Sequence, residues 1–278
     1  MSLDDRKSRN LKSSRERPLV VLKLGGSLIT DKSKPMVMRR DVVRRLCKEI
    51  SRAINEVRLI LVHGAGSFGH PQAKMYRLDE GFKEPHQLEG VTVTKIAVET
   101  LTIELLKELK SSGTKAIPLH PMSFALASSE GLPVPLDLVV KALDLGLVPL
   151  LHGDVVLDSD RGFRIVSGDY IATELAIKLK AKRLIFAMEV DGIFTSDPLL
   201  DPEARLLSVV KPHDLRRIKL RCQYPDVTKG ILGKAMEAFR AVEKGIEVLF
   251  INGLREDYVY RALIGETPEI CTRLSLDE

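Results

Sequence analysis

The chain alternates between short continuous apolar runs and longer segments in which apolar residues recur every three or four positions. The runs are five or six residues long, the length expected of strands that are buried on both faces. They predict strands at 19–24, 58–62, 115–119, 147–151, 183–188 and 246–251. Strands of this kind, separated by helices, indicate an α/β fold with a mainly parallel sheet.

Three of the intervening segments have the periodicity of amphipathic helices. The first is 40–57, whose apolar stripe comprises Val42, Val43, Leu46, Ile50 and Ile54. Helices are likewise predicted at 91–113 and 169–181. The segment 154–169 differs, because its apolar residues alternate with polar ones on both sides of the turn sequence Ser-Asp-Arg-Gly. It therefore predicts a β-hairpin.

The N-terminal residues 1–17 are polar and basic and contain no apolar run of the kind found in a secretory signal. We expect them to form a disordered arm, followed by a single domain over 18–278. No apolar run approaches the roughly 20 residues that cross a bilayer, so no membrane association is expected.

The formal net charge of +5 does not point to a nucleic acid partner. The arm carries six basic and three acidic residues and so accounts for +3 of this charge, which leaves the folded body close to neutral. No stripe of basic and aromatic residues accompanies the charge. The cysteines are scattered and form no C-x-x-C pair, which indicates a reducing cytoplasm rather than zinc or disulfides; they are Cys47, Cys222 and Cys271.

The first predicted strand runs into the loop sequence KLGGSLITDK. Lys23 lies inside an apolar strand, where a lysine costs free energy unless an anion meets it. Gly25 and Gly26 allow backbone N–H groups to approach such an anion, and Ser27 is placed to cap a helix or to bind a phosphate. The alternative is a plain turn, with Lys23 extending to solvent.

The second strand leads into HGAGSFGH, in which Gly64, Gly66 and Gly69 spell the dinucleotide fingerprint G-x-G-x-x-G. The acidic residue that the fingerprint requires about 20 positions later would fall near Glu89, which does not end a strand. A phosphate-binding glycine loop assisted by His70 therefore fits better than a site for NAD. The alternative is that His70 only makes a local bond at the start of a helix.

Three later loops also contain residues of the kind that bind phosphates or metal ions. Asp154 and Asp169 each follow a glycine, one at each end of the hairpin. Two carboxylates placed close together would bind Mg²⁺ or orient lysines. The alternative is that each aspartate only forms part of a turn. Gly230 and Lys234 are predicted at the start of a helix, where an anion is received. There is no G-x-x-x-x-G-K-[ST] and no H-R-D or D-F-G, which excludes P-loop enzymes and protein kinases.

In this order the motifs resemble the amino acid kinase superfamily over about residues 20–265, nearly the whole folded chain. The shared sequences are KLGGS, HGAGSFGH, HGD, SGD, VDGIF and DVTKGI followed by a lysine. The similarity is greatest to the isopentenyl phosphate kinases, because of GSFGH and LITDK. The resemblance implies a three-layer αβα sandwich, an acceptor-binding lobe at about 18–170, an ATP-binding lobe at about 171–278, and a homodimer.

The resemblance also implies transfer of the γ-phosphoryl group of ATP to isopentenyl phosphate, which yields isopentenyl diphosphate. The implied catalytic residues are Lys23, Lys32, His70 and Asp169, of which the aspartate holds the lysines in place. No general base is needed, because the attacking phosphate oxygen is already anionic. Mg²⁺ is expected on the phosphates and water rather than on protein side chains.

The remaining implied residues fall on two sides of the reaction. The acceptor would be bound by Gly64, Ala65, Gly69, His70, Ser167 and Gly168. ATP would be bound by Lys23, Gly25, Gly26, Ser27, Gly66, Met188, Asp191, Gly230 and Lys234. Candidates for the pocket of the acceptor's apolar tail, which are equally typical of ordinary core, are Met75, Tyr76, Phe82, Ile96 and Phe124.

Two departures from the family pattern leave the nucleotide preference open. Met188-Glu189 stands where relatives usually carry Thr-Asp, and Thr228-Lys229 stands before Gly230 where they carry Thr-Gly. Three other functions also stay open. They are a fosfomycin-type or other small phosphate or phosphonate kinase, a nucleotide-binding regulator without catalysis, and an NAD-dependent oxidoreductase.

Overall fold

The sheet of the molecule is built from eight strands and is almost entirely parallel, as expected from the continuous apolar runs. The structure is a computed structural model that describes residues 16–196, 198, 201–221 and 225–276. From one edge to the other the strands are β3 (Ala116–Pro118), β4 (Val148–His152), β2 (Arg58–His63), β1 (Leu19–Leu24), β7 (Arg183–Met188), β9 (Glu247–Asn252), β10 (Cys271–Leu274) and β8 (Val209–Val210). All six predicted strands are confirmed, within a residue or two at their ends.

Two edge strands were not predicted. β10 pairs antiparallel with β9, and the short β8 pairs with β10. They are too short to show a clear apolar pattern. β10 is a strand because the edge of β9 offers it backbone partners, and β8 is one because β10 does the same.

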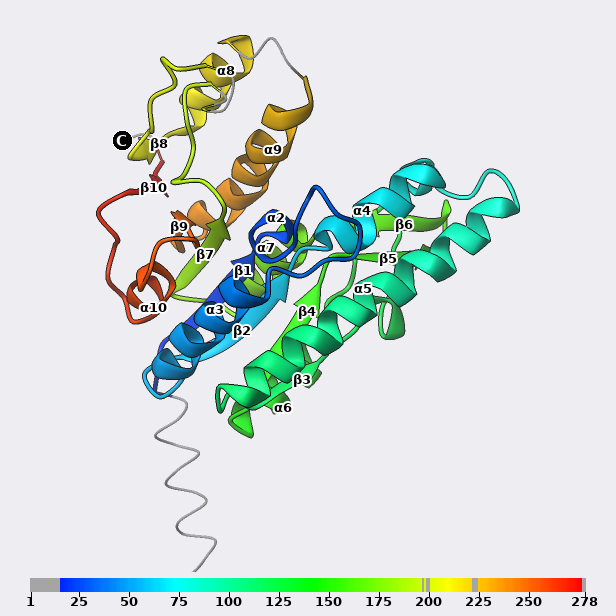
Figure 1. Ribbon diagram of the computed structural model, residues 1–278, viewed down its shortest axis with the longest axis horizontal. Coiled ribbons are helices and arrows are strands. Elements are labelled where there is room, and N and C mark those ends of the chain that lie inside the picture. The colour runs from blue at the N-terminus through cyan, green and yellow to red at the C-terminus, as the bar shows by residue number, and fades with distance from the viewer. Residues whose placement is uncertain (1–15, 197, 199–200, 222–224, 277–278) are drawn as a thin grey trace, which may run out of the picture.

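Helices cover both faces of the sheet, so that the predicted three-layer sandwich is confirmed (Figure 1). Within β1, Val21 belongs to the core on one face and Leu22 to the core on the other. The helices and short 3₁₀ turns are α2 (Gly26–Ile29), α3 (Arg40–Ala53), α4 (Gly66–Met75), η1 (Leu78–Glu80), α5 (His86–Ser111), η2 (Pro121–Ser123), α6 (Leu136–Asp144), α7 (Gly168–Lys178), α8 (Pro212–Arg221), α9 (Pro225–Val242) and α10 (Tyr258–Leu263). α7 and α9 pack on the face that contains Val21, whereas α3, α5 and α10 pack on the other.

The three predicted helices are present, and α5 begins earlier than its apolar pattern indicated. It starts at His86 rather than at residue 91. The side-chain oxygen of Gln87 accepts hydrogen bonds from the backbone N–H groups of Lys83 and Glu84, which stabilises this polar first turn. The one apolar residue of this turn, Leu88, is exposed, so the turn does not continue the apolar stripe of the helix.

The predicted hairpin is confirmed as β5 (Asp154–Asp158) and β6 (Gly162–Val166), which pair antiparallel with Asp154 opposite Val166. The carboxylate of Asp158 accepts hydrogen bonds from the N–H groups of Asp160 and Arg161, and so closes the turn. Because β6 leads directly into α7, the hairpin delivers the start of α7 to the ends of the central strands.

The described residues contain no helix that is long and apolar enough to cross a membrane. Most of the predicted N-terminal arm lies outside the described residues, as does Cys222. Arg17, predicted to end the arm, is instead anchored, because its guanidinium donates hydrogen bonds to the carbonyls of Ile54 and Asn55.

Candidate active site

A cavity of about 920 Å³ lies where β1, β2, β4 and β7 end. β1 is the strand at which the chain order turns from one side of the sheet to the other, the usual position of a ligand site in an open α/β sheet. Of the predicted site residues, all but Asp191 line this cavity: Lys23, Gly25, Gly26, Ser27, Lys32, Gly64, Ala65, Gly66, Gly69, His70, Ser167, Gly168, Asp169, Met188, Gly230 and Lys234.

Two lysines meet one carboxylate at the floor of the cavity. The Nζ of Lys23, on β1, lies 2.8 Å from Asp169 Oδ1, and the Nζ of Lys234, on α9, lies 3.0 Å from Asp169 Oδ2. Burial lowers the pKa of Lys23, and Asp169 opposes this shift. Burial would raise the pKa of Asp169, but the two lysines outweigh it and lower the value. The carboxylate thus keeps two cations side by side at the cavity.

The two predicted glycine loops touch each other backbone to backbone. A Cβ on Gly26 would lie 2.5 Å from the nitrogen of Gly66, and a Cβ on Gly64 would lie 2.7 Å from the nitrogen of Gly26. Thr30 Oγ1 joins the loops, since it donates to the Gly26 carbonyl at 2.7 Å and accepts from the N–H of Ser67 at 2.9 Å. Only glycine permits this contact, so the loops present their backbones to one cavity as a unit.

Ser27 occupies a different position from the one predicted. The N-cap of α2 is Gly25, so Ser27 lies inside the first turn and does not cap it. Its place in the cavity lining agrees with the other role considered for it, that of binding an anion.

His70 lies on α4, within the electrostatic reach of the lysine cluster. Partial removal from water lowers the pKa of its imidazole, and the positive charges of Lys234 and Lys23 lower it further. An anion bound in the cavity would oppose these effects and favour the charged imidazolium. His70 is therefore placed to respond to the charge of a ligand.

Lys32 is held at the rim of the cavity by a residue that departs from the family pattern. Its Nζ forms an ion pair with Glu189, whose other carboxylate oxygen lies 3.8 Å from the Arg39 guanidinium. The Lys32 side chain is 65% exposed, so this pair is weak and open to exchange with a ligand.

The two hairpin carboxylates belong to separate clusters. Asp154 faces Lys95, whose Nζ lies 2.8 and 2.9 Å from its two oxygens, and it also accepts from the N–H of Met122. Asp169 instead binds Lys23 and Lys234. Both carboxylates thus orient lysines, as one of the two predicted roles required, and they do not share a ligand. The described residues hold no cluster of three or more side chains that could bind a metal ion.

Asp191 lies outside the residues that line the cavity. Its carboxylate accepts hydrogen bonds from Arg255 at 2.6 and 2.9 Å and from Asn252 at 2.9 Å. These contacts fasten the loop after β7 to the loop after β9. Its predicted contact with ATP stays a prediction.

The predicted helix start at Gly230 and Lys234 is wrong. α9 begins at Pro225, so Lys234 lies in its third turn and reaches Asp169 with its side chain rather than through the helix terminus. The first turn of α9 is mostly polar, which hides the true start from an apolar pattern. The side chains of Thr228 and Lys229 lie outside the described part of the structure.

The five residues predicted for an apolar tail pocket do not line the cavity. Met75 and Ile96, for example, are 75% and 60% exposed. Beside His70, apolar lining comes instead from α4, α5 and the hairpin: Ala73, Val98, Val155, Ile165 and Val166. Near Met188 and Lys234 further apolar lining comes from Val190, Phe194, Ile218 and Ile231. Sequence reasoning missed these residues because an ordinary apolar position on a helix or strand does not reveal what it faces.

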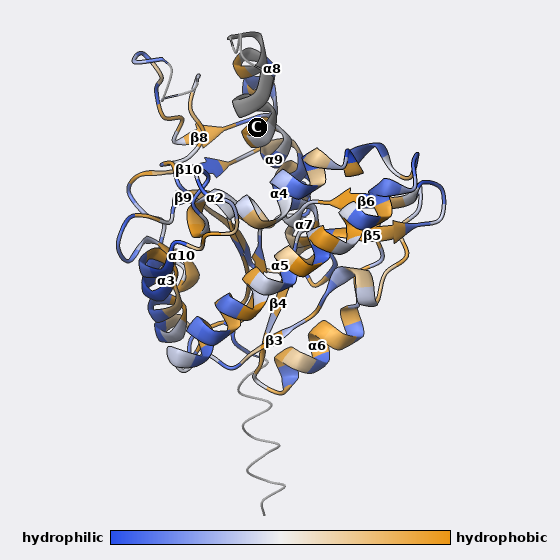
Figure 2. Ribbon diagram, turned by 45° about the vertical axis from the view of Figure 1, so that its right-hand side comes forward, coloured by the Kyte–Doolittle hydropathy of each residue, from blue (hydrophilic) through white to orange (hydrophobic). Residues whose placement is uncertain are grey.

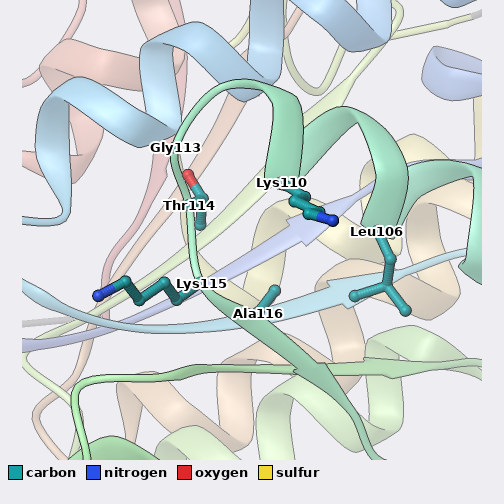
Figure 3. Close-up of a pocket in the computed structure, with 6 residues that line it drawn as sticks. All are labelled: Leu106, Lys110, Gly113, Thr114, Lys115 and Ala116. Carbon is teal, nitrogen blue, oxygen red and sulfur yellow. The ribbon is translucent and has the colours of Figure 1, made fainter.

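A second pocket, of about 430 Å³, lies at the end of α5. Its lining includes Lys110 and Lys115, but the two side chains point away from each other (Figure 3). Two charges that diverge do not converge on one anion, so the larger cavity is the candidate active site.

A fold and a site of this kind define a class of phosphate-transferring enzymes, and comparison with known proteins agrees. A model of the amino acid kinase family matches residues 18–252. The chain belongs to the amino acid kinase family and is a phosphotransferase. The predicted resemblance to this family is confirmed.

Within this family, the chain is similar to isopentenyl phosphate kinases. The chain is 36% identical to the isopentenyl phosphate kinase of Methanothermobacter thermautotrophicus, over 89% of this chain and 96% of that protein. It is 33% identical to the isopentenyl phosphate kinase of Methanocaldococcus jannaschii, with the same coverage. A crystal structure of an isopentenyl phosphate kinase superposes with a TM-score of 0.78 at 34% identity, and covers 92% of this chain and 99% of its own.

Proposed function

We propose that this protein transfers the γ-phosphoryl group of ATP to isopentenyl phosphate and so produces isopentenyl diphosphate. The observation that supports this most directly is that Lys23, Lys234 and His70 share a single cavity with both glycine loops. Such a cavity suits a reaction between two polyanions, in which alignment and charge neutralisation do most of the work. The relatives described above, named isopentenyl phosphate kinases, support the choice of acceptor.

We assign the ATP phosphates to the loop of Gly25, Gly26 and Ser27, and the acceptor phosphate to the loop of Gly64 with His70. Lys23 and Lys32 then stabilise the charge that develops on the transferred phosphoryl group. Lys234 binds ATP phosphate, and Asp169 orients the lysines from below. The acceptor oxygen attacks directly, since it carries a negative charge without the help of a base.

The donor set of the cavity fits Mg²⁺ that arrives with ATP and is held by its phosphates and by water. Both oxygens of Asp169 face lysines, and Asp154 faces Lys95. Mg²⁺ supplies charge neutralisation between the phosphates of ATP. The protein's contribution is its lysines and backbone N–H groups.

We also propose that the two parts of the chain bind different substrates. Residues of about 18–170 supply His70 and the acceptor loop, and residues of about 171–278 supply Lys234 and the rest of the nucleotide side. Both parts contribute strands to one continuous sheet. They therefore form one domain with a shared cavity rather than two independent units.

We also propose that two copies of the chain form a homodimer through the outer face of α5. Ile96 and Ile103 are seven residues apart on this helix, hence on the same face, and are 60% and 51% exposed. Figure 2 shows hydrophobic residues interspersed along α5 and more densely on α6. Light scattering would give twice the mass of 31.0 kDa, and Ile96→Asp with Ile103→Asp would reduce it to the monomer.

The protein is proposed to work in the cytoplasm. Cys47 and Cys271 are free, buried thiols, in agreement with a reducing compartment.

The function is tested by incubating the protein with Mg-ATP and isopentenyl phosphate and following ADP and isopentenyl diphosphate. Parallel reactions contain fosfomycin, or NAD with a small alcohol. Turnover with isopentenyl phosphate is expected. Turnover of fosfomycin alone would assign the second candidate, and absence of ADP in every reaction would favour a regulator.

The acceptor assignment is tested by His70→Ala and His70→Gln. Turnover is expected to fall by about 100-fold or more, because a charge-assisted contact to the acceptor phosphate is lost. ATP binding, measured by calorimetry, is expected to persist. Loss of ATP binding together with turnover would mean that this loop serves the nucleotide instead.

A further inference from the structure

Three histidines gather behind the acceptor loop. His63 ends β2 and His152 ends β4, where the two residues are partners in register. His120 follows β3, and its ring centroid lies 5.3 Å from that of His152, the same separation as between His63 and His152. His63 and His152 are fully buried and lie outside the cavity lining, although the glycine after each of them is part of it.

Each of the two buried rings binds the carbonyl of the glycine that follows it. His63 Nδ1 lies 3.1 Å from the oxygen of Gly64, and His152 Nδ1 lies 3.0 Å from the oxygen of Gly153. A carbonyl oxygen only accepts hydrogen bonds, so both rings donate from Nδ1. Burial lowers the pKa of each imidazole to about 3, which leaves each ring with this single proton at neutral pH.

The remaining ring nitrogens have donors opposite them. Thr102 Oγ1 lies 2.9 Å from His63 Nε2 and 3.0 Å from the carbonyl oxygen of Val98. With the ring proton on Nδ1, His63 Nε2 can only accept, so the single hydroxyl proton of Thr102 points to it in this tautomer. His120 Nδ1 lies 3.1 Å from His152 Nε2 and donates to it, with the carboxylate of Glu99 4.0 Å away. All four nitrogens of the two buried rings are therefore partnered, and their tautomers are determined by the surrounding groups.

The same glycines are also held at their N–H groups. Gly64 donates to the carbonyl of Leu24 at 2.9 Å, and Gly153 donates to the carbonyl of His63 at 3.1 Å. A Cβ on Gly153 would lie 2.8 Å from the nitrogen of Gly168, so this glycine packs against the start of α7. Peptides next to glycine rotate easily. The N–H bonds restrain the peptide before each glycine, and the histidines restrain the peptide after it, through the carbonyls of Gly64 and Gly153.

We propose that His63 and His152 are positioning residues for the acceptor phosphate, because they bind the carbonyls of Gly64 and Gly153 on the buried side. The N–H of a trans peptide points opposite to its carbonyl. Each held peptide therefore turns the N–H of the next residue, Ala65 or Asp154, away from the buried histidine, and keeps a carbonyl oxygen that would repel an anion out of the cavity. The inference rests on the proposed function, since it assigns this side of the cavity to the acceptor. The charged and titratable groups around the pair are Lys23, Lys95, His120 and Glu99.

Asparagine and glutamine distinguish this role from simple packing. The Asn amide nitrogen occupies the place of Nδ1, whereas that of Gln occupies the place of Nε2. In His63→Gln and His152→Gln we expect the KM for isopentenyl phosphate to rise about tenfold or more, which corresponds to one lost hydrogen bond near a charge. In His63→Asn and His152→Asn it should stay within about threefold of the wild-type value.

Two further readouts accompany these measurements. The KM for ATP is expected to be unchanged in all four variants, and thermal unfolding reports whether each one folds. Equal losses in the Asn and Gln variants, or a parallel rise in the KM for ATP, would overturn the proposal. If the wild-type protein forms no isopentenyl diphosphate, the proposed function fails instead. Calorimetry with inorganic phosphate on the same variants then tests the positioning role by itself.

A measurement on the unmodified protein covers the case in which a variant does not fold. Nitrogen NMR of ¹⁵N-histidine-labelled protein reports the tautomer of each of the six histidines, and any folded variant assigns its own signal. His63 and His152 are expected in the Nδ1–H form, unchanged over about pH 6 to 8. A proton on Nε2, or titration of all rings in this interval, would refute the proposal.

Discussion

At the scale of single residues, Asp169 is the group on which the cavity depends most. Its two oxygens face Lys23 and Lys234, and it is 8% exposed. A buried lysine without a partner tends to lose its proton, and a deprotonated lysine gives no charge to a transition state. A single carboxylate therefore preserves two cations.

The substitution Asp169→Asn is expected to lower turnover by about 100-fold or more, because the lysines lose both their charge partner and their orientation. It should also lower the free energy of unfolding by about 3 kcal/mol at neutral pH, the usual cost of removing one member of a buried ion pair. Urea unfolding followed by circular dichroism measures the second effect.

The stability effect of Asp169→Asn has a definite pH dependence. The pKa of Asp169 is lower in the folded protein than in the unfolded chain. Its stabilisation is therefore present above the unfolded value of about 3.9 and is lost as the pH falls toward the folded value. The difference between wild type and variant should shrink below about pH 4. A difference that stays constant there would contradict this assignment.

Glu189 is a second residue whose charge affects the cavity. It holds Lys32 and would repel an incoming phosphate. We expect Glu189→Gln to lower the KM for ATP by about two- to fivefold, a modest change because the pair is exposed to solvent. Glu243→Gln, the same change at an exposed position of the chain, is the control and should leave the KM as it is. A raised KM in Glu189→Gln would mean that the carboxylate assists ATP binding.

At the scale of elements, the site is made where strands end and glycine loops begin. β1 and β2 are neighbours, so the loops that follow them must cross at close range. Gly26, Gly64 and Gly66 make the crossing possible, and Thr30 joins it by hydrogen bonds. The separation of the two loops is thus determined by backbone contact.

Gly64→Ala tests this contact. Its Cβ would lie 2.7 Å from the nitrogen of Gly26, so the loops must separate. We expect the free energy of unfolding to fall by about 1–3 kcal/mol and turnover to be lost, because the phosphate loops move apart. Gly233→Ala on α9 is the control, since nothing lies within 4 Å of its added Cβ. That change should stabilise the helix by up to about 1 kcal/mol. Full activity of Gly64→Ala would show that the contact is dispensable.

At the scale of the whole molecule, one sheet brings the two proposed ligand sites into one cavity. Residues from β1, α4, α7 and α9, far apart in the chain, contribute to it. Lys23 and Asp169 lie between the two proposed sites, so binding at either site is linked to the stability of the common fold.

Each ligand is expected to stabilise the protein by itself. At about 100 times its dissociation constant, ATP or isopentenyl phosphate should add about 2.7 kcal/mol to the free energy of unfolding. In His70→Ala, the shift in unfolding temperature with isopentenyl phosphate should disappear and the shift with ATP should remain. Calorimetric unfolding scans measure both. The loss of both shifts would argue against separate ligand sites.

Much of the fold was predictable because its signals are local. Strands buried on both faces must be continuously apolar, and five of the six runs found this way form the inner part of the sheet. The sixth, β3, is an edge strand. Elements that depend on neighbours were missed, such as β10, which pairs with the edge of β9, and the polar first turns of α5 and α9.

All of the predicted site residues except Asp191 line one cavity, since the motifs that carry them keep their order and spacing along the chain. Their roles in binding and catalysis stay predictions. Asp191 lies outside the cavity, held by Arg255, and the apolar lining was assigned to the wrong residues. Nothing in the sequence around Val98 and Val155 indicates that these residues line a cavity rather than pack in the core.

The sequence by itself determined the α/β class, the order along the chain of six strands and the hairpin, and the residue types proposed to bind phosphate, because these follow from periodicity and local chemistry. Only the tertiary structure decided which residues meet. It paired Asp169 with two lysines, Asp154 with a third, and His63 with His152. Such pairs join positions up to 146 residues apart, from Lys23 to Asp169, and their distances depend on how the helices and the sheet pack around the core.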